Sequence, residues 1–209
     1  MKYQAILFDM DGTLVNSEPL HQQAFEETFK QFDIAMTDDD FKSYIVGKTD
    51  TNGLKDYLTH INKQLDIPDF NTKKAAAYAS LASEHLASYP GIVELVRDLA
   101  NIVPLALVTN SHRSEADLVL KSLDIDGCFD IIITADGVEK GKPSPEGYLR
   151  AMNLLSKQPE DCVIVEDSPT GVTAANEAGI RCIAVTNTHS EGELAHADLV
   201  VSEITKDLF

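Results

Sequence analysis

Short apolar runs recur along the chain, separated by longer amphipathic segments. Six runs are typical of buried strands: Ala5–Phe8, Leu105–Val108, Ile131–Ile133, Val163–Val165, Ile183–Val185 and Leu199–Val201. The segments between the later runs, Ser114–Leu123, Ser144–Leu155 and Ser168–Gly179, have helical periodicity, and each begins with serine, a residue favoured at helix N-caps. Strand and helix therefore alternate, which predicts an α/β fold with a doubly wound parallel sheet covered on both faces.

The interval between the first two apolar runs is too long for a single crossover helix. Four helical patterns fill it: Glu18–Phe32, Asp38–Val46, Thr51–Leu65 and Lys73–Ala87. The next pattern, Pro90–Ala100, has the character of a helix that returns to the sheet. We therefore expect a helical domain at residues 17–89, inserted into a core made of residues 1–16 and 90–209. The hinges should fall near Asn16–Pro19 and Ser88–Gly91.

Composition and charge narrow the class of protein. The 209 residues are 44% hydrophobic, which indicates a folded chain, and 34 acidic against 17 basic residues give a formal net charge of −17. This charge repels nucleic-acid phosphates and anionic membrane surfaces, so we expect neither as a partner. No signal-peptide pattern and no apolar run of about 20 residues is present, so we expect a soluble, cytoplasmic protein.

The chain has three cysteines, Cys128, Cys162 and Cys182, which show no C-x-x-C spacing. Two of them adjoin apolar runs that are typical of strands. Free cysteine packs as a small hydrophobe, so we expect core positions in place of a disulfide or a metal site.

Polar residues directly follow five of the apolar runs. They are Asp9–Asp11, Thr109–Ser111, Thr134–Asp136, Glu166–Ser168 and Thr186–Thr188. In open α/β sheets the ligand crevice lies outside the carboxyl ends of the strands. We therefore expect these five polar tips to converge on one site.

Asp9 and Asp11 are two residues apart after the first strand. On an extended chain such residues point to the same side, roughly 6.6 Å apart, so both could face one ligand. Taken alone, the Asp-Gly pair is equally typical of a turn. A calcium-binding EF-hand loop is excluded, because Leu14 and Leu20 occupy the positions that require glycine and glutamate.

A second acidic pair, Glu166 and Asp167, follows the fourth strand. In isolation this pair could simply cap the next helix. Together with Asp9 and Asp11 it makes four carboxylates, whose mutual repulsion would be costly unless a hard cation bound among them. Mg²⁺ fits such a site best.

Groups suited to a phosphate occur at two further places. Thr109, Asn110 and Ser111 offer hydroxyl and amide groups, together with backbone N–H groups at the start of a helix. Lys142 is held stiffly on a loop between glycine and proline, although a lone lysine in an acidic protein is also typical of a solvated surface. A nucleotide-binding P-loop is excluded, because Asp136 and Pro143 stand where that motif requires glycine and Ser or Thr.

Taken together and in this order, these residues resemble the motifs of the haloacid dehalogenase (HAD) superfamily of phosphotransferases, over the whole chain. The matching residues are Asp9, Asp11, Gly12 and Thr13 of D-x-D-G-T, the strand-end Thr109, the G-K-P lysine Lys142, and the acidic pair Glu166 and Asp167. The resemblance implies a HAD-like, Rossmann-like core, and the insertion resembles that family's helical cap. The segment Glu166–Ile180 is similar to the branch that contains β-phosphoglucomutase and 2-deoxyglucose-6-phosphatase.

The resemblance implies a role for each motif residue. Asp9 attacks phosphorus to give an aspartyl-phosphate, and Asp11 donates a proton to the leaving oxygen and later activates water. Thr109, Asn110 and Lys142 stabilise the charge on the transferring phosphoryl group.

The resemblance also implies the metal shell. Asp9 binds Mg²⁺ through its side chain and Asp11 through its backbone carbonyl, while Asp167, with Glu166 directly or through water, completes the shell. A dehalogenase needs neither a second aspartate nor the metal, so phosphoryl transfer is favoured.

We therefore predict a Mg²⁺-dependent phosphatase for a small phosphomonoester, such as a sugar phosphate, with Asn110, Ser111, His21 and Lys48 as substrate-binding residues. The alternative is a β-phosphoglucomutase-like mutase. The segment Val46–Asp50 resembles the mutase cap loop, but it contains no arginine and has Lys48 as its only cation, which weakens that alternative. A non-enzymatic receiver module, which gathers a similar acidic site, is a third interpretation.

Overall fold

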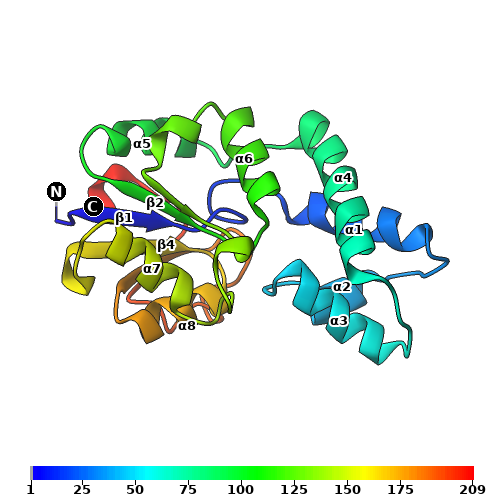
Figure 1. Cartoon of the computed structure of the whole chain (residues 1–209). Helices are drawn as coiled ribbons and strands as arrows, with labels where there is room; N and C mark the ends of the chain where they lie inside the picture. The colour runs from blue at the N-terminus through cyan, green and yellow to red at the C-terminus, as the bar shows by residue number, and fades with distance from the viewer. Residues whose placement is uncertain (1) are drawn as a thin grey trace.

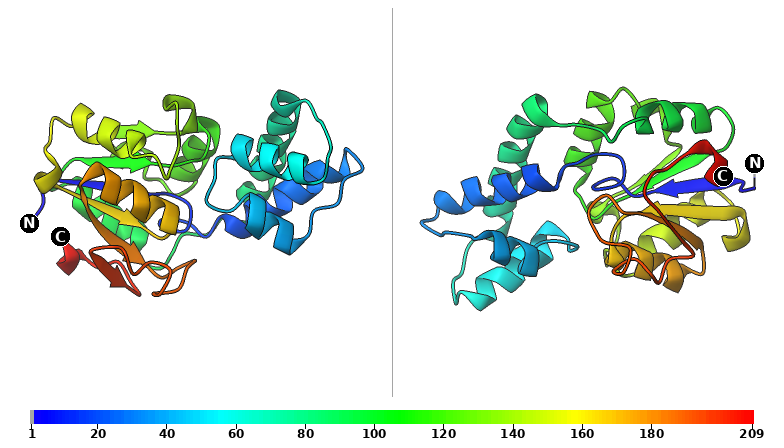
Figure 2. Two further views of the ribbon diagram at one scale, coloured as in Figure 1. Left: turned by 90° about the horizontal axis from the view of Figure 1, so that it is seen from below. Right: turned by 180° about the vertical axis from the view of Figure 1, so that it is seen from behind.

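The computed structural model describes residues 2–209. They form a parallel sheet covered by helices and, beside it, a separate group of four helices (Figure 1). The two ends of the described segment, residues 2 and 209, lie at the end of the sheet farthest from that group (Figure 2). None of the helices in the described part of the chain combines the length and the apolar character that crossing a membrane requires.

The sheet has six parallel strands in the order β3-β2-β1-β4-β5-β6. Their bounds are β1 (Ala5–Phe8), β2 (Leu105–Val108), β3 (Ile131–Ile133), β4 (Cys162–Glu166), β5 (Arg181–Val185) and β6 (Leu199–Val201). The predicted α/β fold is thus confirmed, with one strand at each predicted apolar run. The strand order reverses between β1 and β4, and ligands of such sheets bind at the carboxyl ends of the strands beside this switch point.

Four helices cover the sheet, two on each face (Figure 1). They are α5 (Ile92–Ala100), α6 (Arg113–Ser122), α7 (Glu146–Leu154) and α8 (Pro169–Ala178). Side chains alternate along β1, so that Ile6 and Phe8 pack with α5 and α6, whereas Leu7 packs with α7 and α8. All three cysteines are free, and Cys162 and Cys182 are fully buried in β4 and β5, as expected of small apolar side chains.

Only one of the three serines predicted to cap a helix does so. Ser168 caps α8, as expected. The prediction was wrong for Ser114, because α6 is capped by His112, whose backbone amide donates to the carboxylate of Glu115 (3.4 Å). It was also wrong for Ser144, because a proline stands between this serine and the first residue of α7.

Four further helices lie between β1 and β2: α1 (Glu18–Lys30), α2 (Asp38–Tyr44), α3 (Asp50–His60) and α4 (Ile67–His85). We call residues 17–89 the helical insertion. Aromatic rings fill its centre, with the ring centroids of Phe29 and Phe70 4.5 Å apart and those of Phe29 and Tyr57 5.2 Å apart. The helical insertion therefore has a hydrophobic core of its own.

The helical insertion is joined to the rest of the chain at two places. Its two connecting segments run beside each other, because the amide of Asn16 donates to the carbonyl of Ala87 (3.0 Å) and the amide of Tyr89 donates to the carbonyl of Leu14 (3.1 Å). In addition, α4 packs against α6 of the core. These contacts place α1, α2 and α3 over the carboxyl end of the sheet (Figure 1).

Candidate active site

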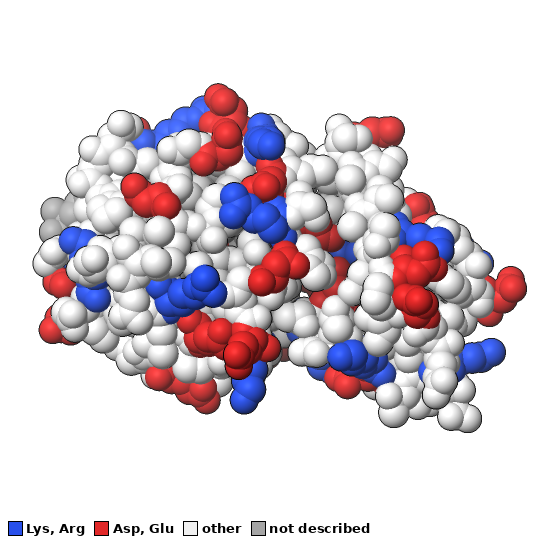
Figure 3. Space-filling model, in the orientation of Figure 1, with Lys and Arg blue, Asp and Glu red and all other residues white. Residues whose placement is uncertain are grey.

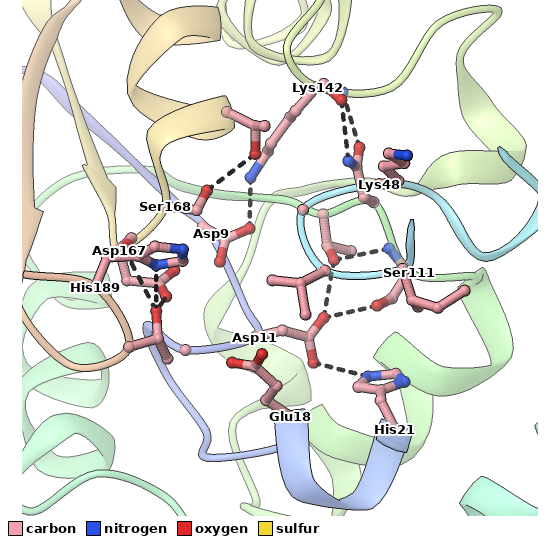
Figure 4. A pocket seen from close by; sticks show the side chains of 18 of the residues that line it. Asp9, Asp11, Glu18, His21, Lys48, Ser111, Lys142, Asp167, Ser168 and His189 are labelled. Atoms are coloured by element: carbon pink, nitrogen blue, oxygen red, sulfur yellow. Dashed lines mark hydrogen bonds and ion pairs between the residues drawn. The ribbon is translucent and has the colours of Figure 1, made fainter. Parts of the chain in front are cut away.

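The carboxyl ends of the strands open into a pocket of about 130 Å³ between the sheet and the helical insertion (Figure 4). Four of the five predicted polar tips line it: Asp9 and Asp11 after β1, Thr109–Ser111 after β2, Asp167 and Ser168 at the end of β4, and Thr188 after β5. The expectation that all five converge was wrong for the tip after β3. There Asp136 binds the ring of His112 (2.8 Å) and the amide of Arg113 (2.7 Å). Because β3 is an edge strand, its end lies away from the switch point.

Three buried carboxylates meet at the switch point. One oxygen from each of Asp9, Glu166 and Asp167 lies within 4.8 Å of the others. The register of the sheet explains this, because Phe8 of β1 is paired with Val165 of β4 and the acidic residues follow directly. Burial, opposed by an ion pair with a lysine, raises the pKa of Asp9 to about 7.

Lys142 reaches this acidic cluster from the loop before α7. Its ammonium group donates to Asp9 Oδ1 and to Glu166 Oε1, the latter at 2.7 Å. Burial would lower the pKa of Lys142, but the two carboxylates outweigh burial and raise it, so the side chain stays cationic. The alternative of a solvated surface lysine is therefore wrong, since this side chain is buried in an ion-pair network.

Glu166 is surrounded by hydrogen-bond donors. Its carboxylate accepts from the Tyr148 hydroxyl (2.9 Å), the amide of Asp167 (2.9 Å) and both the amide and the hydroxyl of Ser168 (3.1 and 3.0 Å). A Cβ atom at Gly171 would lie 1.7 Å from Glu166 Oε1, so only glycine fits at this position of α8. Burial raises the pKa of Glu166, but the ion pair with Lys142 outweighs it and lowers the pKa.

Asp167 is packed against the turn that follows β1. Its carboxylate accepts hydrogen bonds from the hydroxyls of Thr13 (3.2 Å) and Thr188. Gly12 has a φ of +84°, and a Cβ atom there would lie 2.0 Å from Asp167 Oδ2, so both the turn and the close approach require glycine. Burial, followed by the charges of Asp9 and Glu166, raises the pKa of Asp167 well above its ordinary value. The cluster thus gathers three carboxylates around one lysine, and every atom that it offers to a ligand is an oxygen.

Asp11 lies outside this acidic cluster. Its carboxylate points toward the helical insertion (Figure 4), where it accepts hydrogen bonds from Ser17 (2.5 Å), Ser111 (2.6 Å), Thr109 (3.3 Å) and His21 (3.3 Å). Burial raises the pKa of Asp11, but these donors, led by His21, outweigh burial and leave the pKa below its ordinary value. The structure therefore places the two aspartates of the motif in different electrostatic settings.

The polar tip after β2 has two functions in the structure. Thr109 and Ser111 direct their hydroxyls into the pocket beside Asp11. Asn110 holds the lysine loop, because its Oδ1 accepts from the amide of Lys142 (2.8 Å) and its Nδ2 donates to the carbonyl of Lys142 (3.2 Å). Its amide group is therefore already engaged, and Asn110 contributes to the pocket wall.

The helical insertion brings the other two predicted substrate-binding residues to the pocket. His21 lines it and lies between Asp11 and Lys74, whose ammonium group is 2.9 Å from His21 Nδ1. Lys48 also lines it, but its ammonium group is paired with Asp56 at 2.7 Å.

The sequence did not predict a role for several residues near the pocket. Lys74 is buried and bridges Asp50 of the helical insertion (2.6 Å) to Glu115 of α6 (2.8 Å). The sequence around Lys74 predicts only an amphipathic helix. Nothing in that pattern distinguishes Lys74 from its exposed neighbour Lys73. A signal did exist for Gly171, since glycine inside a helical pattern indicates a close approach.

Comparisons with known proteins agree on a family. The chain is 34% identical over 206 residues, 98% of its length and 95% of the relative's, to the validoxylamine A 7'-phosphate phosphatase of Streptomyces hygroscopicus subsp. limoneus. It is 32% identical over 192 residues, 91% of its length and 88% of the relative's, to the phosphorylated carbohydrates phosphatase of Thermotoga maritima. The crystal structure of CbbY from Rhodobacter sphaeroides in complex with phosphate matches 96% of this chain and 94% of that chain, with 30% identity and a TM-score of 0.88. Residues 6–185 match the haloacid dehalogenase-like hydrolase family, and the chain belongs to that family.

Proposed function

We propose that this protein is a Mg²⁺-dependent phosphatase that hydrolyses a small phosphomonoester, such as a sugar phosphate, through an aspartyl-phosphate. The observation that carries the proposal is the position of Asp9, which stands on the pocket floor in a buried acidic cluster and is held by a buried lysine. The two relatives, a validoxylamine A 7'-phosphate phosphatase and a phosphorylated carbohydrates phosphatase, support the substrate class.

Asp9 is suited to act as the nucleophile. Lys142 holds its Oδ1, whereas its Oδ2 accepts no hydrogen bond from residues 2–209. In the proposed reaction this second oxygen attacks phosphorus in line, the bond from phosphorus to the leaving oxygen breaks, and water later cleaves the aspartyl-phosphate. Lys142 keeps the carboxylate oriented and lowers the cost of bringing it toward an anionic phosphate.

Asp11 is suited to the proton transfers. It lies at the mouth of the pocket, between the core and the helical insertion, and it can give a proton to the leaving oxygen and later take one from water. With its present partners its pKa is too low for a general acid. We therefore propose that Asp11 gives up contacts with Ser17 and His21 when a substrate is bound, which would bring its pKa back toward the range needed.

The hydroxyls of Thr109 and Ser111, with the ammonium group of Lys142, are proposed to bind the oxygens of the transferring phosphoryl group. Asn110 supports them by holding the Lys142 loop. On the face that Figure 3 shows, acidic side chains are spread over both the core and the helical insertion. This acidic surface disfavours an extended anionic partner. The few donors inside the pocket, from Thr109, Ser111 and Lys142, suit a single small phosphate group better.

The acidic cluster fits a hard divalent cation. Mg²⁺ would be held by the side chains of Asp9 and Asp167 and by the backbone carbonyl of Asp11. The donors already crowded around Glu166 favour a contact through water for that residue. When bound, the cation offsets the charge of nucleophile and phosphate.

The helical insertion is proposed to act as a cap domain, residues 17–89, over a catalytic core of residues 1–16 and 90–209. Its own hydrophobic core lets it move as a unit about the two hydrogen-bonded connecting segments and the α4–α6 contact, which stay in place. Closure would exclude bulk water and bring His21 and Lys48 to the leaving group. The mutase alternative needs a strong anchor for a second phosphate, and Lys48, which is already paired with Asp56, is a poor one. Membership of a hydrolase family argues against the receiver module.

The proposal is tested by measuring phosphate release from a panel of phosphorylated metabolites, with Mg²⁺ and with excess chelator. We expect multiple turnovers with Mg²⁺, loss of activity with chelator, and a loss of at least ~10³-fold in Asp9→Asn. Full activity in chelator, or in the purified Asp9→Asn protein, would contradict the proposed reaction.

A further inference from the structure

One of the polar tips that line the pocket has no part in the proposed reaction. It is the tip after β5, where Asn187, Thr188 and His189 lie just beyond the end of the strand. Thr188 and His189 both line the pocket, and Figure 4 shows His189 beside Asp167. The contacts of this tip indicate what it holds in place.

The hydroxyl of Thr188 is directed at a proposed metal ligand. It donates a hydrogen bond to Asp167 Oδ2, while the hydroxyl of Thr13 donates to Oδ1 of the same carboxylate (3.2 Å). The Thr188 hydroxyl also lies 3.4 Å from the carbonyl of Asp167, but a charged carboxylate is the stronger acceptor. An oxygen with two lone pairs can accept one hydrogen bond and still bind a cation. The two hydroxyls therefore fix the rotation of the carboxylate without blocking it.

His189 fixes the direction of the Thr188 hydroxyl. Its Nδ1 lies 2.8 Å from Thr188 Oγ1 and 3.0 Å from the carbonyl of Asp167. A carbonyl can only accept a hydrogen bond, so Nδ1 carries the hydrogen and donates to both oxygens. Thr188 Oγ1 therefore accepts on the side of His189, and its own hydrogen is left for Asp167 Oδ2. The imidazole N–H, the hydroxyl and the carboxylate form one directed chain.

The same tip is tied to the turn that follows β1. Asn187 Nδ2 donates to the carbonyl of Gly12 at 2.8 Å. The tip after β5 thus contacts both of the other tips that carry the proposed metal ligands. Residues that hydrogen-bond to a metal ligand commonly set its orientation and the affinity of the site.

We propose that Thr188, oriented by His189, is a positioning residue that holds the carboxylate of Asp167 ready for a divalent cation and thereby sets the affinity of the site for Mg²⁺. The inference rests on the proposed function, because it takes Asp167 as a ligand of Mg²⁺. Neither Thr188 nor His189 needs to touch the cation or the substrate in this role.

Two other roles predict something different. If the tip after β5 only joined neighbouring loops, loss of the Thr188 hydroxyl would lower stability and leave the affinity for Mg²⁺ unchanged. If His189 only bound the substrate, its loss would leave the affinity of the substrate-free protein for Mg²⁺ unchanged. The test must therefore measure cation binding itself, without a substrate and apart from activity.

The experiment measures the dissociation constant for Mg²⁺ by isothermal titration calorimetry of the full, metal-stripped chain at one fixed pH. Thr188→Val keeps the shape of the side chain without the hydroxyl, and we expect it to weaken Mg²⁺ binding by about 10- to 100-fold. Thr188→Ser keeps the hydroxyl and should stay within about threefold of the wild type. His189→Leu should weaken binding by about three- to tenfold, and His189→Asn, which keeps an N–H at the δ position, should weaken it less.

A double variant tests the route by which His189 acts. Because His189 orients the Thr188 hydroxyl, the loss in Thr188→Val/His189→Leu should fall clearly short of the product of the two single losses. Thr186→Val is the matched control, since Thr186 belongs to the same segment, is partly buried and does not line the pocket. It should bind Mg²⁺ as tightly as the wild type.

The possible failures are distinguishable. Wild-type affinity in Thr188→Val, whether or not its Tm falls, would overturn the inference and leave the proposed phosphatase function intact. Losses that multiply in the double variant would overturn the role assigned to His189. Failure of the wild type to bind Mg²⁺ at millimolar concentrations would overturn the proposed cation and the inference with it.

Discussion

At the scale of single residues, Asp9 and Asp11 show how two carboxylates of one short turn acquire opposite properties. Burial and neighbouring carboxylates, opposed by Lys142, raise the pKa of Asp9 to about 7. Burial also raises the pKa of Asp11, but His21 and the hydroxyls of Ser111 and Ser17 outweigh it and hold that pKa below its ordinary value. Paired titratable groups whose environments separate their pKa values are typical of acid–base sites. The proposed roles require the opposite order, with Asp9 ionised and Asp11 able to hold a proton, so binding of the cation and the substrate must move both pKa values.

Gly171→Ala tests whether the fixed position of Glu166 matters. The new Cβ atom would stand 1.7 Å from Glu166 Oε1, so the carboxylate must shift and its contact with Lys142 must weaken. We expect phosphatase activity to fall at least ~10-fold and stability to fall by about 1–3 kcal/mol, as in other overpacked sites. Gly192→Ala is the control, because nothing lies within 4 Å of a Cβ atom there. Wild-type activity in Gly171→Ala would show that this position of Glu166 is not needed.

At the scale of elements, the contact between α4 and α6 connects the helical insertion to the core through a buried charge. Lys74 has a side-chain exposure of 1% and is paired with Asp50 and Glu115. The two carboxylates outweigh burial and raise its pKa, so the lysine stays charged. Removing one member of a buried ion network leaves the others uncompensated, which is far more costly than losing an exposed pair.

Lys74→Met and Lys73→Met form a matched pair on one helix. We expect Lys74→Met to lower the free energy of unfolding by about 3–5 kcal/mol, because Asp50 and Glu115 lose their partner. Lys73 is exposed and paired only with Asp69, so Lys73→Met should cost less than ~1 kcal/mol. Urea denaturation followed by circular dichroism measures both. Equal effects of the two substitutions would show that the buried network does not stabilise the fold.

The elements also show what a sequence can and cannot predict. All six strands coincide with apolar runs. The reason is plainest for β1 and β2, in which every residue is buried, because a strand buried on both faces of a parallel sheet must be apolar throughout. The motif residues Asp9, Lys142 and Asp167 could be anticipated because each ends a strand or lies on a stiff loop. Lys74 and Glu115 could not, since these residues are 41 positions apart in sequence and their pairing depends on how two helices pack together.

At the scale of the whole molecule, the fold concentrates negative charge where a cation should bind. The chain carries a net charge of −17, and three of its carboxylates are buried together with one lysine. Stability, pH and metal binding should therefore be coupled. The direction in which stability changes with pH follows from Asp9, whose pKa rises from an ordinary 3.8 to about 7 in the folded protein.

A group with a raised pKa stabilises the fold at low pH, and this contribution is lost as the pH rises through the folded value. In metal-free protein we therefore expect the wild type to lose stability relative to Asp9→Asn between about pH 4 and about pH 7. A difference of at least ~1 kcal/mol, or about 2–4 °C in Tm, should be visible by calorimetry. Mg²⁺ should restore the stability of the wild type more at about pH 8 than at about pH 5, because a protonated Asp9 is a poor ligand. Parallel pH profiles for both proteins would contradict this coupling.

The central claim is that Asp9 carries the phosphoryl group, and trapping that group tests it most directly. The protein is mixed with a substrate and Mg²⁺, quenched with acid during turnover, and treated with borohydride, which reduces an acyl-phosphate to an alcohol. Peptide mass spectrometry then locates the reduced residue. We predict reduction at Asp9 alone, dependent on substrate. Turnover without a reduced peptide, or reduction at Asp11, would contradict the account.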